Sequence, residues 1–256
     1  MCTLAVREHS PGIRIIGYQH AVVPEAALNM FLHPQDAGVV PLPDRILTVG
    51  EVTAGLLRKY GNYPPGVLHT ACALRYEYFK QAKADPLPWR GHVLVVLDGV
   101  SQSAHLLEYV LAQFNAQTPW DIVLRAHPAL PRSYWQKHYG QQISWRTRIK
   151  WSDQSLHQDL DWADAVVYWQ STVAWEALSR GRAVVNFATR DILSYDPLLN
   201  CPFLRWSVTV DNSLFDVLGH IRGLSPEVKM EQYRQARDMI EQCFYPVSDQ
   251  GLKSFF

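Results

Sequence analysis

Residues 165–187, AVVYWQSTVAWEALSRGRAVVNF, decide how this chain is expected to fold. The first four residues of this stretch predict a buried strand, and the last five predict the next one. Ser171 and Thr172 stand where the first strand would turn into a helix, and Gly181 is suited to end that helix. A strand, a helix and a second strand in this order predict two parallel strands joined by a crossover helix.

The same alternation precedes and follows this stretch. Further strands are predicted at residues 92–97, 121–124, 148–151 and 206–210. Helices are predicted at 101 to about 117, 131–139, 156–162, 213–222 and 226–243. Strands that alternate with helices predict an α/β fold, a Rossmann-like parallel sheet with helices on both faces.

The N-terminal part of the chain repeats this pattern over a shorter length. Strands are predicted at residues 13–17, 44–50 and 67–70, and helices at 51–60 and 74–82. Two prolines within residues 85–89 predict a linker. We therefore expect residues 1–85 to form a partial first domain with a connecting segment, and residues 86–256 to form the second, larger domain.

Composition excludes several classes of protein. Lys+Arg and Asp+Glu are both 24, so the charge balance does not favour a nucleic-acid partner. No apolar run approaches the roughly 18 residues of a transmembrane helix, and the four scattered cysteines predict neither disulfides nor zinc. The sequence also lacks a P-loop, a G-x-S-x-G elbow, a full G-x-G-x-x-G and metal-ligand spacing. We expect a cytoplasmic protein.

The predicted helix start at Ser171 and Thr172 is a candidate anion site. A helix N-terminus offers free N–H groups and partial positive charge, and two hydroxyls add donors for a phosphate. Glu176 lies four residues after Thr172, hence on the same face, where its carboxylate could accept hydrogen bonds from ribose hydroxyls. The alternative is an ordinary helix cap with a solvated glutamate.

A second candidate follows the strand predicted at residues 121–124. Pro128 holds His127 at the carboxyl edge of the sheet, where an imidazole N–H can meet a phosphate oxygen. Arg125 could add charge-assisted hydrogen bonds. A turn histidine before a proline is the alternative. The pairing of this motif with Ser171 and Thr172, at two strand ends of one sheet, favours a nucleotide site.

Two further loops contribute candidates. Gly99 lets the backbone approach a ligand closely, and Ser101 is expected to cap the helix that follows. Gln19 and His20 end the first predicted strand, so they could contact substrate, and His20 could act as a base. A structural role for His20 is the alternative.

These motifs together resemble a known family. The pairing of His127-Pro128 with Ser171-Thr172, followed by EAL at 176–178 and GRAVV at 181–185, resembles the C-terminal domain of GT-B-fold glycosyltransferases. The likeness is to bacterial enzymes of capsule and lipopolysaccharide synthesis. In sialyltransferase-like and Kdo-transferase-like members, an HP motif and an S-S/T motif hold the nucleotide phosphates. Residues 17–20, GYQH, are similar to the family's QHG stretch, with Ala21 in place of glycine.

The resemblance implies a nucleotide-sugar donor, no separate cofactor, and a saccharide or lipid-linked acceptor. It covers residues 13–187, and CDP-glycerol-type polymerases and nucleotide-sugar epimerases share a similar architecture. A full GT-B protein has two Rossmann-like domains, and the family's catalytic base comes from the first. Here only about three strands of that domain are expected, so His20 is the one catalytic candidate.

Two functional expectations therefore stay open. The first is a glycosyltransferase of surface polysaccharide synthesis, cytoplasmic or peripheral at the inner membrane, with a protein partner as one source of the missing N-terminal domain. The second is a non-catalytic nucleotide-binding module or one subunit of a split GT-B enzyme.

Overall fold

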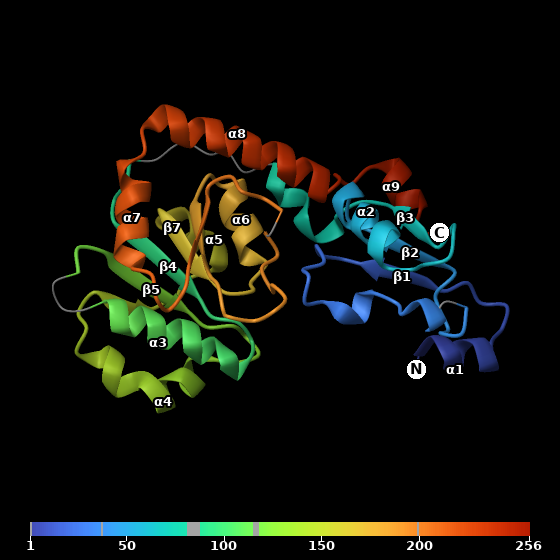
Figure 1. The fold of residues 1–256 in the computed structure, drawn as a ribbon, viewed down its shortest axis with the longest axis horizontal. Helices are drawn as coiled ribbons and strands as arrows, with labels where there is room; N and C mark the ends of the chain where they lie inside the picture. Colours follow the sequence, from blue (N-terminus) through green and yellow to red (C-terminus); the bar gives the residue numbers. More distant parts are fainter. Residues whose placement is uncertain (1, 37, 81–87, 115–117, 199) are drawn as a thin grey trace. The chain divides into compact units, whose positions relative to one another are not determined.

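The computed structural model describes residues 2–36, 38–80, 88–114, 118–198 and 200–256, which form parts of two compact units (Figure 1). The first unit comprises residues 1–81 and 238–256, and the second comprises residues 82–237. The linker expected at residues 85–89 lies mostly outside the described residues. The C-terminal residues differ from expectation, because 238–256 belong to the first unit rather than to the larger one.

The second unit is built around a six-stranded parallel sheet with the order β6-β5-β4-β7-β8-β9 (Figure 1). The strands are β4 (His92–Val96), β5 (Asp121–Arg125), β6 (Ile149–Trp151), β7 (Ala165–Tyr168), β8 (Ala183–Phe187) and β9 (Arg205–Val208). This confirms the predicted Rossmann-like α/β fold. The apolar runs predicted these strands to within a few residues because parallel strands are buried on both faces.

Helices connect and cover these strands. They are α3 (Ala104–Gln113), α4 (Arg132–Ser144), α5 (Leu156–Trp162), α6 (Val173–Ser179), α7 (Leu214–Gly223) and α8 (Pro226–Cys243), with the 3-10 helix η4 (Ser101–Ser103) before α3. The helix expected to extend to about residue 117 ends at Gln113. Residue 117 itself lies outside the described residues.

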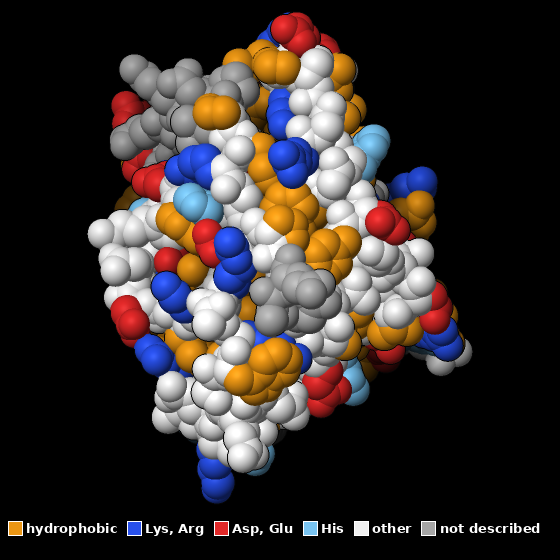
Figure 2. Space-filling view, turned by 90° about the vertical axis from the view of Figure 1, so that its left-hand side faces the viewer, with side chains coloured by type: hydrophobic (Ala, Val, Ile, Leu, Met, Phe, Trp, Pro, Cys, Tyr) orange, Lys and Arg blue, Asp and Glu red, His pale blue; other side chains and the backbone are white. Residues whose placement is uncertain are grey.

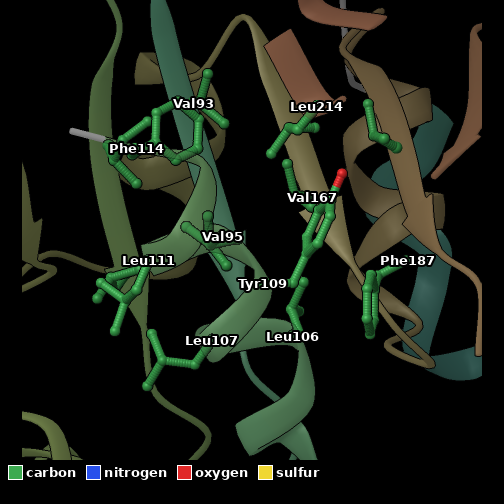
Figure 3. Close-up of a cluster of buried hydrophobic side chains, with 14 of the residues drawn as sticks. Val93, Val95, Leu106, Leu107, Tyr109, Leu111, Phe114, Val167, Phe187 and Leu214 are labelled. Atoms are coloured by element: carbon green, nitrogen blue, oxygen red, sulfur yellow. The ribbon is translucent and has the colours of Figure 1, made fainter. Parts of the chain in front are cut away.

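One face of the sheet carries the main hydrophobic core. Val93 and Val95 of β4 and Val167 of β7 pack against buried side chains of α3, α4 and α7. Figure 3 shows Leu107 and Leu111 of α3 beside this part of the sheet. The intervening strand residues point to the opposite face. That face also excludes water, since α5 contacts β4 and α6 contacts β7 and β8.

A buried carboxylate fixes the irregular segment between β8 and β9. Asp196 accepts hydrogen bonds from the hydroxyl of Tyr168 at 2.8 Å and from Nε of Arg205 at 2.8 Å. The backbone N–H of Leu198 donates to the same carboxylate at 2.8 Å. Because the side chain of Asp196 is 1% exposed, its charge depends on these three partners.

The first unit contains a smaller parallel sheet of order β1-β2-β3. Its elements are α1 (Cys2–His9), β1 (Ile16–Gln19), η1 (Leu28–Met30), η2 (Pro34–Asp36), β2 (Arg45–Thr48), α2 (Glu51–Tyr60), β3 (Leu68–Thr70), η3 (Leu74–Lys80) and α9 (Asp249–Lys253). Three expectations need correction. Helix α1 was not expected, β1 begins three residues later than predicted, and the helix expected at 74–82 is a kinked 3-10 helix.

C-terminal residues complete this unit. The N–H of Tyr245 donates to the carbonyl of Val49 at 2.7 Å, and the N–H of Ala73 donates to the carbonyl of Tyr245 at 2.8 Å. Gly50 lies so close to Cys243 that an added Cβ would be 2.2 Å from the Cys243 carbonyl oxygen. The end of the chain therefore supplies backbone partners for the segments after β2 and β3.

The described residues contain neither a membrane-spanning helix nor a cluster of metal ligands. No helix there combines the length and apolar character that crossing a bilayer requires. No group of three or more metal-ligating side chains is present among those residues. Cys72, Cys201 and Cys243 are buried.

We expect Asp196→Ala to lower the free energy of unfolding by about 3–5 kcal/mol, because it leaves the Arg205 cation and the Tyr168 hydroxyl without their shared partner. Urea denaturation followed by circular dichroism measures this loss. Asp211→Ala is the control, since the Asp211–Arg190 ion pair is exposed on both sides and its loss should cost about 1 kcal/mol or less. Equal losses in the two variants would contradict a structural role for the buried carboxylate.

Candidate functional site

The order of the six strands reverses at one position. β4 and β7 are neighbours, but the chain leaves β4 toward β5 and β6 and leaves β7 toward β8 and β9. In open parallel sheets, ligands bind outside the carboxyl ends of the strands where the order reverses in this way. The loops after β4, β5 and β7 are therefore the candidate site.

Asp98 joins two of these loops. It follows β4, is 8% exposed, and its carboxylate accepts a hydrogen bond from the N–H of Gln170, after β7, at 3.4 Å. The N–H of Asp98 donates to the hydroxyl of Ser103 at 2.8 Å. Burial raises the pKa of the Asp98 carboxyl from 3.8 to about 6, although the Gln170 N–H and the Ser103 hydroxyl lower it.

Sequence reasoning assigned no role to Asp98. The residue was visible only as an acidic side chain directly after a buried strand and before Gly99. That position was a usable signal, because it is the carboxyl end of a strand in a parallel sheet.

Gly99 and His127, which follow the neighbouring strands β4 and β5, meet. A Cβ built on Gly99 would lie 2.6 Å from Nδ1 of His127, so the imidazole occupies the space that a side chain would need. The N–H of Ala129 donates to Nδ1 of His127 at 3.0 Å. Since Nδ1 accepts, the neutral ring carries its proton on Nε2. His127 is exposed, which leaves that N–H available to a ligand.

Arg125 is engaged elsewhere. Its Nη1 donates to the carboxylate of Asp159 at 2.6 Å and to the carbonyl of Gln154 at 2.9 Å. Asp159 is 4% exposed and also accepts from the hydroxyl of Ser152. This ion pair ties β5 to α5, which differs from the phosphate contact expected for Arg125.

The turn after β7 places three more predicted residues together. The hydroxyl of Ser171 accepts a hydrogen bond from the N–H of Val173 at 3.3 Å, and Thr172 stands at the N-cap position of α6 without a side-chain cap. Glu176 is 3% exposed, so the alternative of a solvated glutamate is wrong. Among the described residues, no side chain or backbone N–H donates a hydrogen bond to its carboxylate.

Ser101, Gln19 and His20 are the remaining predicted residues. Ser101 starts η4 and makes no cap hydrogen bond, so its expected capping role is wrong. Instead α3 begins at Ala104. Gln19 and His20 lie at the carboxyl end of β1 in the first unit, where Gln19 donates to the carbonyl of Ala21 at 3.2 Å and His20 is exposed.

Neither a protein-family model nor a curated protein matches the chain. Solved structures do match. A glycosyltransferase from Rickettsia africae ESF-5 aligns with a TM-score of 0.60 and 10% identity over 99% of this chain and 72% of that one. Anabaena Alr3699/HepE in complex with UDP and glucose aligns with a TM-score of 0.60 and 11% identity over 95% and 70%.

A nucleotide-sugar epimerase is also similar. Methanocaldococcus jannaschii UDP-GlcNAc 2-epimerase, in complex with UDP-GlcNAc and UDP, aligns with a TM-score of 0.57 and 12% identity over 93% of this chain and 70% of that one. Identities this low establish the fold alone. The chain has the Rossmann-like α/β fold of these GT-B proteins.

Asp98 makes the stability of the protein depend on pH in a defined direction. The pKa of the Asp98 carboxyl is about 6 in the folded protein and has its ordinary value of 3.8 in the unfolded chain. As the pH falls, the folded state therefore binds the proton before the unfolded state does, and the free energy of unfolding rises between pH 6 and 3.8. We expect Asp98→Asn to raise the free energy of unfolding at pH 8 by roughly 1–3 kcal/mol.

The gain should shrink toward zero near pH 4, where the wild-type carboxyl is protonated in the folded state. Denaturant titrations at pH 8 and pH 4 test this. Asp153→Asn, at an exposed carboxylate, is the control and should change little at either pH. A gain of equal size at both pH values would show that burial of the charge is not its cause.

Proposed function

We propose that this protein is a glycosyltransferase that moves a sugar from a nucleotide-sugar donor to an acceptor of cell-surface polysaccharide or lipopolysaccharide. The observation that carries the proposal is that Gly99, His127 and the turn at Ser171 and Thr172 follow β4, β5 and β7 at one sheet edge, where strand order reverses. The complex of Anabaena HepE with UDP and glucose, on a similar fold, supports a nucleotide-sugar donor. Activity belongs in the cytoplasm, at the membrane for a lipid-linked acceptor.

The donor diphosphate is assigned to His127, Ser171 and Thr172. Nδ1 of His127 already accepts a hydrogen bond from the N–H of Ala129. The proton is therefore on Nε2, which can donate a hydrogen bond to a ligand. Ser171 uses its oxygen as an acceptor for Val173, so its O–H is free to donate. Gly99 allows this approach because it has no side chain to displace the imidazole. We leave Arg125 out of this set because Asp159 holds it.

The ribose is assigned to Glu176. A buried carboxylate without a donor among the described residues is costly, and two ribose hydroxyls would supply donors. Glu176 lies one helical turn after Thr172, so phosphate and ribose would contact successive turns of α6.

Transfer requires that charge on the departing nucleotide be stabilised. Negative charge grows on the phosphate oxygen as the bond to the sugar breaks, and fixed N–H and O–H donors at that oxygen lower the barrier. We assign this role to His127, Ser171 and Thr172. Activation of the acceptor hydroxyl is assigned to the first unit, with His20 as the candidate base.

We expect His127→Ala to weaken UDP binding by about tenfold, because it removes a hydrogen bond to a charged oxygen. Isothermal titration calorimetry with UDP, CDP and CMP measures the affinity for each nucleotide and identifies the preferred nucleobase. His138→Ala is the matched control, since His138 is an exposed histidine on α4. Unchanged affinity in His127→Ala removes the phosphate role.

The same samples separate an enzyme from a binding module. Release of free sugar or transfer from the preferred nucleotide-sugar supports the transferase. Nucleotide binding without either reaction supports a non-catalytic module or a subunit of a split enzyme. A folded sample that binds none of the nucleotides contradicts both.

Glu176→Gln should erase the preference for ribose. We expect wild-type protein to bind UDP about tenfold more tightly than its 2′,3′-dideoxy analogue, and the variant to bind the two with similar affinity. The measured quantity is the ratio of the two affinities. Altered packing that weakens the binding of both nucleotides equally would leave this ratio unchanged. Discrimination that persists in the variant would assign the ribose to other residues.

A further inference from the structure

A cavity lies at the edge of the six-stranded sheet opposite to the candidate site. Asp164 directly precedes β7, Arg182 directly precedes β8 and Leu204 directly precedes β9, and all three line the cavity. Because the strands are parallel, their starts share one edge, separated from the turn at Ser171 by roughly 15 Å of strand. The end of α7 and the first turns of α8 complete the lining.

The walls of this cavity are mainly apolar. They are formed by Trp89, Leu204, Trp206, Ile221, Leu224 and Met230. The enclosed part of the cavity measures about 40 Å³, and the wider space of about 540 Å³ around it includes open solvent. Figure 2 shows the side of the molecule that carries α7, where hydrophobic side chains reach the surface among Lys and Arg side chains.

Arg182 brings an unpaired donor group to this cavity. It is 8% exposed, its Nε donates to the carbonyl of Leu160 at 3.0 Å, and its Nη2 donates to the carbonyl of Asp161 at 3.3 Å. Among the described residues, Nη1 has no hydrogen-bond partner, and it is not among the atoms sealed from solvent. Two N–H donors of a nearly buried cation therefore remain available.

Lys229 is the second cation. Its ammonium makes no hydrogen bond or ion pair within the described part of the chain, and burial lowers the pKa of this group although the Asp164 carboxylate raises it. Asp164 itself is fully engaged. It pairs with Arg90 and accepts from the backbone N–H groups of residues 90, 91 and 92. Asp164 therefore does not neutralise both cations.

We propose that this cavity binds a compact organic carboxylate with a flat apolar body. The carboxylate would lie between Nη1 of Arg182 and the ammonium of Lys229, and the body would pack against Trp89 and Trp206. Two cations in an apolar cavity are satisfied by one anion, and carboxylate geometry suits a guanidinium. This site is separate from the proposed donor site and does not depend on it.

The probe is 2-naphthoate, and 2-naphthalenemethanol is its neutral counterpart. By isothermal titration calorimetry we expect one equivalent of 2-naphthoate to bind with a dissociation constant of about 0.01–1 mM. The alcohol should bind at least about tenfold more weakly, because it lacks the charge. Saturating UDP should not displace 2-naphthoate, since the two sites lie at opposite edges of the sheet.

Lys229→Met tests the charge while keeping the apolar stem, and we expect it to weaken 2-naphthoate binding about tenfold. Lys137→Met, at an exposed lysine of α4, is the matched control and should leave binding unchanged. Leu224→Trp should abolish binding by filling the cavity.

Three results would each overturn the proposal. They are no binding of 2-naphthoate by folded wild-type protein, equal binding of acid and alcohol, and displacement by UDP. Unaltered affinity in both Lys229→Met and Leu224→Trp would place the ligand elsewhere and overturn it as well.

Discussion

The pairing of β4 with β7 is the constraint on which the second unit depends. Parallel strands cannot be joined by tight turns, so each connection must cross a face of the sheet. Once β4 and β7 are neighbours, crossovers in one half run away from those in the other. Their loops therefore diverge at this seam. The buried carboxylate of Asp98 spans the seam and holds its two sides at a fixed distance.

Much of this architecture was predictable because strands that are buried on both faces of a sheet consist of continuous apolar residues. The run at 165–168 coincides with β7, and the run at 183–187 coincides with β8. The predicted site residues are a different matter. The sequence could place Gly99 and His127 at the ends of two predicted strands, and the structure brings them into contact. Their role in binding a nucleotide stays a prediction.

What the sequence could not show are pairings between distant residues. Arg125 and Asp159 are 34 positions apart, and nothing in the local pattern around Arg125 distinguishes a buried ion pair from a ligand contact. The raised pKa of Asp98 likewise depends on how deeply tertiary packing buries the carboxyl. The pattern around residues 74–80 predicted an α-helix, but the segment is a kinked 3-10 helix packed through Tyr76 and Phe79 against Phe244, far along the chain.

The return of the C-terminal residues to the first unit has a consequence for synthesis. Domains generally fold as units in the order in which they emerge from the ribosome. Here the carbonyl of Val49 and the N–H of Ala73 form their hydrogen bonds only with Tyr245. The first unit therefore completes its folding after the second unit has been synthesised. Until then, its nascent chain exposes the backbone and apolar groups that the final residues will cover. The second unit, whose residues form one continuous run, carries no such delay.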